Sequence, residues 1–179
     1  MINQLIEVGS FLKNSYTIVD MNKKDQPLIF VNRTFEKTTQ YSCQEVLGKN
    51  CRFLQGIGTD PEAAKFIKLC IKNRSAFHID ILNYRKDGSE FWNRLCLLPF
   101  KRGEISLYYG MQHEIDAPKS IDKLQPNEML NGFIKDRVNN FYQTLLLSIE
   151  QLKKNSNRDR VRHQIDSAAT RISEFVLNL

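Results

Sequence analysis

Three extended segments in the middle of the sequence constrain its fold more than any other feature. Phe77 to Tyr84 and Phe91 to Phe100 alternate their side chains as strands do, and the Asp87-Gly88 pair between them is a strong hairpin signal. A further strand is predicted from Ile105 to Glu114. Upstream, TIVD and LIFVN flank the turn-like segment NKKDQP and predict a second hairpin. The predicted fold is therefore α+β, with a five-stranded antiparallel sheet.

Helices are predicted before the first hairpin and between the two hairpins. Met1 to Ser15 fits a short amphipathic helix, and Thr34 to Leu47 reads as a helical region. A third helix should start near Pro61 and run to about Asn73, because proline suits the first turn of a helix. Its apolar stripe comprises Ala64, Ile67 and Ile71. Lys68 interrupts this stripe, so its ammonium group needs an anionic partner or solvent.

The composition excludes several classes of protein. The chain has 179 residues, 41% of them hydrophobic and 26% charged, which suits one folded domain with an appendage and not a fibrous or disordered protein. No segment approaches the roughly 20 apolar residues that span a bilayer, and no signal-peptide pattern is present, so we expect a cytoplasmic protein without membrane association. The four cysteines form no C-x-x-C pair, so we expect free thiols and no metal site.

Two carboxamides lie on apolar strand faces. Asn83 follows Ile81 on one face of its strand, and Asn93 precedes Leu95 on one face of the next. A buried amide without a hydrogen-bond partner costs about 1 to 3 kcal/mol. Either these amides bond to the backbone at the strand ends or point outward, or they bind a planar ligand that has a hydrogen-bonding edge.

The segment GKNCRFLQG, from Gly48 to Gly56, surrounds Cys51 with residues that follow no regular period, as in a loop or short turn. It resembles the flavin-binding signature G-x-N-C-R-F-L-Q of LOV domains, the blue-light-sensing branch of the PAS fold. The resemblance extends from about Tyr16 to Gln112 and includes DQPLIFVN, YSCQEVLG, TDPEA, NYRKDGSEFWN and YYGMQ in the order usual for that family.

The resemblance implies that Cys51 is the photoreactive cysteine. In LOV domains, blue light excites the bound flavin and the thiol adds reversibly to its ring, so the residue would be a switch and not a turnover catalyst. Held geometry matters more than acidity, because a free cysteine has a pKa near 8.5 and starts as the thiol. Gln112 would transmit the signal: its amide should rotate once the adjacent ring nitrogen is protonated, which changes the hydrogen bonds of the last strand.

The same resemblance assigns three groups of residues to the flavin. The polar edge and ribityl chain would bond to Asn50, Gln55, Asn83, Asn93 and Gln112. The ring would be lined by Leu54, Ile71, Ile81, Leu95, Leu97 and Gly110. Arg52 and Lys68 would meet the phosphate of FMN. The family usually has arginine at the second of these positions, and lysine offers only a point charge, so riboflavin and FAD are alternative cofactors.

Four positions near the ring depart from the residues usual in LOV domains. They are Thr17, Val19, Gln26 and Tyr108. We expect these residues to alter the lifetime of the cysteinyl-flavin adduct. Recovery kinetics that stay unchanged when the usual residues are restored would refute this expectation.

The sequence divides into four predicted segments. They are a cap helix at residues 1–15, a LOV domain at 16–113, a linker at 114–126 and a helical hairpin at 127–179. Apolar residues at spacings of three and four run from Leu130 to Leu152 and from Val161 to Leu179, which predicts the hairpin. Two helices alone bury little surface, so we expect a homodimer through the terminal helices, or binding to a separate signalling protein.

The segment DRVNNFYQTLLLSIEQL is similar to the first dimerisation helix of one histidine-kinase family, with Asp136 where the phosphoacceptor histidine would be. No ATP-binding pattern follows, so we expect a dimerising scaffold and not an enzyme. Five basic residues and one acidic residue lie between Leu152 and Arg162, which a solvated helix turn explains better than a nucleic-acid surface.

The leading prediction is a blue-light photoreceptor whose reversible cysteinyl-flavin adduct changes the packing of the terminal helices. A flavin-based redox sensor is the alternative, and it would not need Cys51. A sensory or dimerising remnant of a histidine-kinase system is another. A PAS module without a ligand is a third alternative, against which the set of amides argues.

Overall fold

The computed structural model describes residues 14–118 together with Ile6, Gly9, Ser10, Leu12, Ser167 and Arg171. In the predicted cap helix, Ile6, Gly9 and Ser10 are helical and Leu12 is not, and the other residues before Asn14 lie outside the described residues. The predicted hairpin at 127–179 also lies outside them, except for Ser167 and Arg171, which are helical. The four segment boundaries therefore stay predictions.

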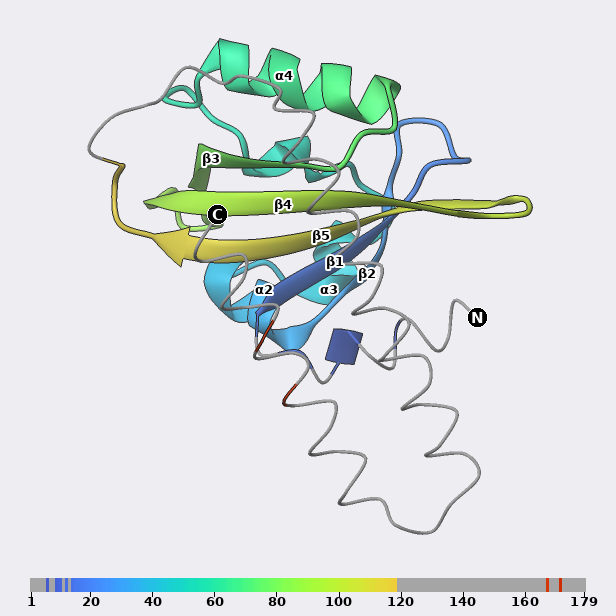
Figure 1. Ribbon diagram of the computed structural model, residues 1–179. Coiled ribbons are helices and arrows are strands. Elements are labelled where there is room, and N and C mark those ends of the chain that lie inside the picture. The colour runs from blue at the N-terminus through green and yellow to red at the C-terminus, as the bar shows by residue number, and fades with distance from the viewer. Residues whose placement is uncertain are drawn as a thin grey trace, which may run out of the picture.

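Five strands form one antiparallel sheet in the spatial order β2-β1-β5-β4-β3 (Figure 1). Their bounds are β1 Ser15–Asp20, β2 Leu28–Val31, β3 Phe77–Tyr84, β4 Glu90–Arg102 and β5 Ile105–Ile115. The predicted five-stranded sheet is thus confirmed. Because β1 and β5 are neighbours at its centre, the last strand of the domain contacts the first.

Short helices connect the two halves of the sheet. They are α2 Arg33–Thr39, α3 Cys43–Val46, the 3₁₀ helix η1 Cys51–Leu54 and α4 Pro61–Lys72. Figure 1 shows α4 beside β3 at one end of the sheet, and α2 and α3 beside β1 and β2 at the other. None of the helices within the described part of the chain is long and apolar enough to cross a membrane.

The predicted helical region from Thr34 to Leu47 consists of two short helices, α2 and α3, separated by a break. Gln40 adopts a left-handed conformation, with φ of 64°, and ends α2. A new helix, α3, starts after Ser42, whose backbone N–H donates to the Glu45 side chain in a capping box. The chain therefore turns between two short helices instead of continuing one long helix.

The start of α4 agrees with the prediction, whereas its buried face is offset from the predicted stripe. The Asp60 side chain caps the helix by accepting from Glu62 N, and Pro61 occupies the first turn. Ala63 and Cys70 are the buried residues of α4, and Ile67 packs at the margin of the same cluster. Ala63 and Cys70 lie about two helical turns apart, so they share one face of α4. This buried face lies beside the predicted row of Ala64, Ile67 and Ile71.

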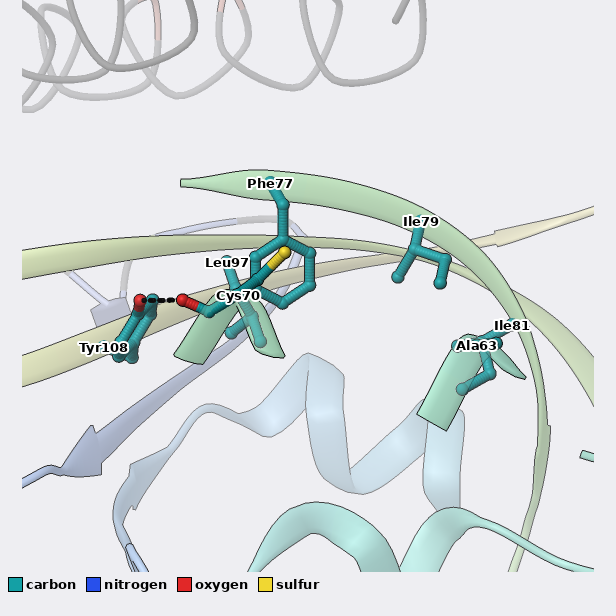
Figure 2. Close-up of a cluster of buried hydrophobic side chains, with 7 residues drawn as sticks. All are labelled: Ala63, Cys70, Phe77, Ile79, Ile81, Leu97 and Tyr108. Carbon is teal, nitrogen blue, oxygen red and sulfur yellow. Dashed lines mark hydrogen bonds between the residues drawn. The ribbon is translucent and has the colours of Figure 1, made fainter. Parts of the chain in front are cut away.

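Two apolar clusters lie between the helices and the sheet. The first, which we call the α4 cluster, comprises Ala63, Cys70, Phe77, Ile79, Ile81, Leu97 and Tyr108 (Figure 2). The second, the η1 cluster, comprises Leu28, Val31, Phe35, Val46 and Leu54. Val19 on β1 packs against both clusters, so they form two adjoining parts of one core.

Candidate functional site

Cys51 lies at the first position of η1, next to the η1 cluster. The preceding residue, Asn50, caps this short helix because its Oδ1 accepts a hydrogen bond of 3.0 Å from Arg52 N. Leu54 anchors the other end of η1 in the core, and Cys51 itself is partly buried against the η1 cluster. Burial raises the pKa of the Cys51 thiol to about 12. Its sulfur is therefore protonated at neutral pH.

The apolar residues predicted to line a flavin ring lie together. Ile81 and Leu97 belong to the α4 cluster, and Ile71 and Leu95 pack against it. Leu54 belongs to the η1 cluster, which Cys51 also contacts. Because Val19 touches both clusters, the structure brings the predicted lining and the cysteine into one region beneath the helices.

Tyr108 adds a polar anchor to this region. It is a member of the α4 cluster, and its hydroxyl donates to Ser75 O at 3.0 Å and lies 3.4 Å from Cys70 O (Figure 2). Burial raises the pKa of this phenol, so it stays a donor. The hydroxyl ties β5 to the end of α4, a contact that the phenylalanine usual in LOV domains cannot make.

The two strand amides point inward and bond to one another. Asn83 and Asn93 are 4% and 1% exposed, and Asn93 Nδ2 donates to Asn83 Oδ1 at 2.8 Å. Asn83 Nδ2 in turn donates to Leu82 O at 3.1 Å. This bond agrees with the interpretation that the amides bond to the backbone. Asn93 Oδ1 is buried and finds no hydrogen-bond partner among the described residues. An acceptor of this kind fits a ligand that carries a donor.

Gln112, like Asn93, has a buried amide oxygen without a hydrogen-bond partner among the described residues. It projects from β5, where it pairs with Ser15 on β1 and Leu95 on β4, and it is 4% exposed. Its Oε1 is buried without a partner in the part of the chain that the structure describes. Two orphaned amide oxygens on the helix-facing side of the sheet cost free energy unless a ligand satisfies them.

Gly110 is explained by strand packing. A Cβ atom at this position would lie 2.4 Å from Thr17 Oγ1 and 3.3 Å from Leu97 Cδ2, both on neighbouring strands. The Thr17 hydroxyl lies 3.5 Å from Gly110 O. We predicted this glycine for close approach of a ring, and the close approach within the structure is that of Thr17.

The polar residues of the cysteine segment face the β1–β2 turn. Asn50 Nδ2 donates to Asp25 O at 2.6 Å and to Gln26 O at 3.4 Å, and Arg52 pairs with the Asp25 carboxylate at 2.6 Å. Asp25 and Gln26 both have positive φ. Asn50 thus has a structural role in holding this turn to η1, beside the predicted role in flavin binding.

The predicted phosphate-binding cations lie at the surface. Arg52 on η1 and Lys68 on α4 are both exposed, and Gln55 at the end of η1 is partly buried. Lys68, which interrupts the predicted apolar stripe, is therefore exposed to solvent, one of the two outcomes expected for it.

Ser15 is a site residue that the sequence reasoning missed. It is 2% exposed, and its Oγ is buried without a partner among the described residues. A serine at the first position of a strand gives no signal in the sequence, because serine is also common at strand ends and in turns. Only the pairing of β1 with β5 brings it opposite Gln112.

The unsatisfied amide oxygens and the apolar residues around them fit a flavin. A flavin ring is planar and largely apolar and carries hydrogen-bonding groups along one edge, which matches orphaned amides of Asn93 and Gln112 beside the α4 cluster. The Cys51 thiol lies at the adjoining cluster.

Comparison with known proteins identifies the family. The PAS domain family matches residues 13–117. The LOV domain of a blue-light activated histidine kinase from Erythrobacter litoralis is 42% identical, with a TM-score of 0.57, and the match covers 59% of this chain and 99% of that domain. The chain belongs to the LOV branch of the PAS domain family. The light-state LOV domain of Aureochrome1 is also similar, at 33% identity and a TM-score of 0.56 over 64% of this chain and 87% of that one.

The chain is a LOV-type blue-light sensing domain related to blue-light-activated histidine kinases. One such relative, blue-light-activated histidine kinase 2 of Erythrobacter litoralis, is 35% identical over 173 residues, which are 96% of this chain and 49% of that kinase. The chain spans about half the length of this relative and 20% of a kinase from Brucella anthropi. LOV domains typically bind flavin, and one similar LOV structure is described with a flavin analogue.

Proposed function

We propose that this LOV domain binds a flavin and that Cys51 bonds to it reversibly in blue light, forming a cysteinyl-flavin adduct. One observation carries the proposal. The buried oxygens Asn93 Oδ1 and Gln112 Oε1 lack partners among the described residues, and they lie on the strand face that carries the proposed ring-lining residues. A flavin edge would supply a donor to Asn93 Oδ1, and it would meet the Gln112 amide with an acceptor in the dark and with a donor in the light.

Cys51 contributes a thiol and not a thiolate. Its sulfur would form a bond to a ring carbon of the photoexcited flavin, while its proton passes to the neighbouring ring nitrogen. The S–H bond and the double bond between these two ring atoms would be replaced by an S–C bond and an N–H bond, so the addition would need no separate oxidant or reductant. The reverse step would restore the thiol. The pKa of about 12 supports this role, because the proton stays on sulfur in the dark.

Gln112 would convert this event into a change in the sheet. Its amide faces an acceptor in the dark and a donor after Cys51 has released its proton, so the amide must rotate to keep a hydrogen bond. Because Gln112 is paired with both β1 and β4, the change would reach the centre of the sheet and the end of β5.

We propose FMN as the cofactor. Arg52 and Lys68 are exposed cations, and Arg52 can form charge-assisted hydrogen bonds to a phosphate. The Asp25 carboxylate, 2.6 Å from Arg52, competes with that phosphate. We expect FMN to bind more tightly than riboflavin, and we expect Arg52→Gln to reduce that difference, with Lys68 still present. Equal affinities in the wild type would contradict the phosphate assignment.

The test of flavin binding is a titration of purified protein followed by quenching of flavin fluorescence. The variants Asn93→Ala and Gln112→Ala should each weaken binding by about twofold to tenfold, as expected for loss of one hydrogen bond. Asn22→Ala is the matched control, because Asn22 is exposed and bonds to Glu104 O away from both clusters. A wild-type protein that neither copurifies with nor takes up a flavin would overturn the proposal.

For the output, we propose a homodimer through the C-terminal segment. The two apolar stripes predicted in that segment support it, because two helices alone bury little surface and a second copy would cover them. Size-exclusion chromatography with light scattering, in the dark and under blue light, tests it. A dimer in at least one state is expected, and a monomer in both states at micromolar concentration would refute it.

A further inference from the structure

Ser15 and Gln112 are cross-strand partners that leave polar atoms unsatisfied. β1 and β5 pair antiparallel with Ser15 opposite Gln112. Ser15 Oγ and Gln112 Oε1 are both buried, and each lacks a hydrogen-bond partner among the described residues. Two unpaired polar atoms on paired residues are an unusual cost for a sheet to carry.

The two side chains share one face of the sheet. Thr17 lies two residues after Ser15 on β1, and Gly110 lies two residues before Gln112 on β5. Thr17 Oγ1 covers Gly110 on the side where a Cβ would point, so these partners face the same way, and alternation gives Ser15 and Gln112 that face as well. Directly opposite residues have Cβ atoms about 4.5 to 5.5 Å apart, within reach of a glutamine side chain.

We propose that Ser15 is a positioning residue that supplies a hydrogen bond to the Gln112 amide in both of its orientations. The inference rests on the proposed function. A hydroxyl group can donate one hydrogen bond and accept others, whereas an amide has a donor end and an acceptor end. Serine is therefore suited to an amide that turns round.

In the dark orientation, the Gln112 NH₂ group points at an acceptor on the flavin, and the Ser15 hydroxyl donates to Gln112 Oε1. After rotation, Gln112 Oε1 accepts from the flavin, and its NH₂ group donates to Ser15 Oγ. Both orientations then have the same number of hydrogen bonds. An alanine at position 15 would leave one end of the buried amide unpaired in each orientation.

Three variants test the proposal. Ser15→Ala removes the hydroxyl, and Ser15→Thr keeps it. Ser106→Ala is the matched control, because Ser106 is a buried serine of β5 that bonds to Arg74 and lies near the far end of that strand from Gln112. Each protein is loaded with FMN and measured by light-minus-dark infrared difference spectroscopy, with the Gln112 carbonyl band identified by its loss in Gln112→Leu.

The expected result is specific to Ser15→Ala. Its dark-state Gln112 carbonyl band should move to higher wavenumber, because the oxygen loses a donor, and its dark recovery rate should change by about threefold to tenfold. Ser15→Thr and Ser106→Ala should match the wild type in both respects. In flavin-free protein, Ser15→Ala should unfold at the same urea concentration as the wild type or a higher one, because the hydroxyl has no partner there.

Two results would overturn the inference. If Ser15→Ala responds to light with the wild-type band position and recovery rate, Ser15 does not position Gln112, while the proposed function stands. If the wild-type protein binds no flavin or does not respond to light, the proposed function and this inference fail together.

Discussion

The Cys51 thiol and the Gln112 amide are held in different ways. Cys51 starts a four-residue 3₁₀ helix whose N-cap is the Asn50 side chain, and it contacts the η1 cluster. Gln112 belongs to an 11-residue strand with neighbours on both sides. A rotation of the Gln112 amide would therefore act at the centre of the sheet, whereas Cys51 lies on a short helix outside the sheet.

Burial of two thiols predicts how stability depends on alkaline pH. Burial raises the pKa of Cys51 and of Cys96 to about 12, from an ordinary value of 9.0. In the unfolded chain both thiols ionise above pH 9, while in the folded protein they stay protonated. The free energy of unfolding should therefore be unaffected by these thiols below pH 9 and fall as the pH rises toward 12. At pH 10 each thiol should lower it by roughly 1 kcal/mol.

Urea unfolding at pH 8 and pH 10 checks this prediction, with Cys51→Ala beside the wild type. The variant should lose part of the pH-dependent decrease, since burial also raises the pKa of Cys43 and Cys70, which contribute beside Cys96. The buried phenols Tyr108 and Tyr109, whose pKa is raised from 10.0, add to the decrease mainly at still higher pH. A wild-type free energy of unfolding that does not change between the two pH values, or an equally steep decrease in the variant, would show that Cys51 is not buried as described.

At the level of single residues, the sequence indicates which polar side chains need hydrogen-bond partners but not which residues supply them. The apolar faces around Asn83 and Asn93 predicted that these amides need partners if the faces point inward, and both amides are buried. That the two would bond to each other depends on the β3–β4 register, which no single-strand pattern contains. Ser15 is missed for the same reason, because its partner lies 97 residues away in the chain.

Among the secondary-structure elements, Asn32 joins three segments at one point. Its Oδ1 accepts from Tyr16 N and Phe35 N, both at 3.0 Å. Its Nδ2 lies within hydrogen-bond distance of three carbonyl oxygens of the N-terminal segment, those of Gly9, Leu12 and Asn14. One buried amide thus links β1, the start of α2 and the chain before β1.

Asn32→Asp should lower the free energy of unfolding by about 2 kcal/mol or more. The change keeps the size of the side chain but replaces the NH₂ donor with a carboxylate oxygen, which would face carbonyl oxygens in a buried site. Chemical denaturation measures the difference. Asn22→Asp is the matched control, since Asn22 is exposed and donates a single hydrogen bond to Glu104 O. Equal effects of the two substitutions would contradict the proposed link.

The contact between β1 and β5 at Gly110 makes a second prediction for this level. Gly110→Ala should lower the free energy of unfolding by about 1 to 3 kcal/mol, because its Cβ would lie 2.4 Å from Thr17 Oγ1. Combining it with Thr17→Ala removes that hydroxyl and should recover part of the loss. A double-mutant cycle by urea unfolding measures the coupling, and strictly additive effects of the two changes would contradict the contact.

The strands were predicted better than the helices, and the reason is physical. Strand alternation and the Asp87-Gly88 turn are local signals, and β3 ends at the predicted residues. The break between α2 and α3 could not be predicted, because no glycine or proline marks it in the sequence. Gln40 adopts a positive φ there, at a cost that the surrounding contacts offset. Helices as short as α2 and α3 depend on such contacts more than on propensity.

For the molecule as a whole, the sheet order connects the light-sensing region to the ends of the domain. β5 lies between β1 and β4, so the strand that carries Gln112 contacts both the first strand and the 13-residue strand β4. The chain beyond β5 is the part of the sequence that is shared with a histidine kinase but not with an isolated LOV domain. A change at Gln112 therefore arises on the strand that leads directly into the proposed output segment.

The most direct test of the central claim is the absorbance spectrum of the flavin-loaded protein before and after a blue flash, with Cys51→Ala measured beside it. We predict that the structured flavin absorption band bleaches under the flash and recovers in the dark in the wild type, and that Cys51→Ala binds flavin but does not bleach in this way. Flavin binding without reversible bleaching in the wild type would contradict the photoswitch and favour a redox sensor, and the same bleaching in Cys51→Ala would exclude the thiol as its cause.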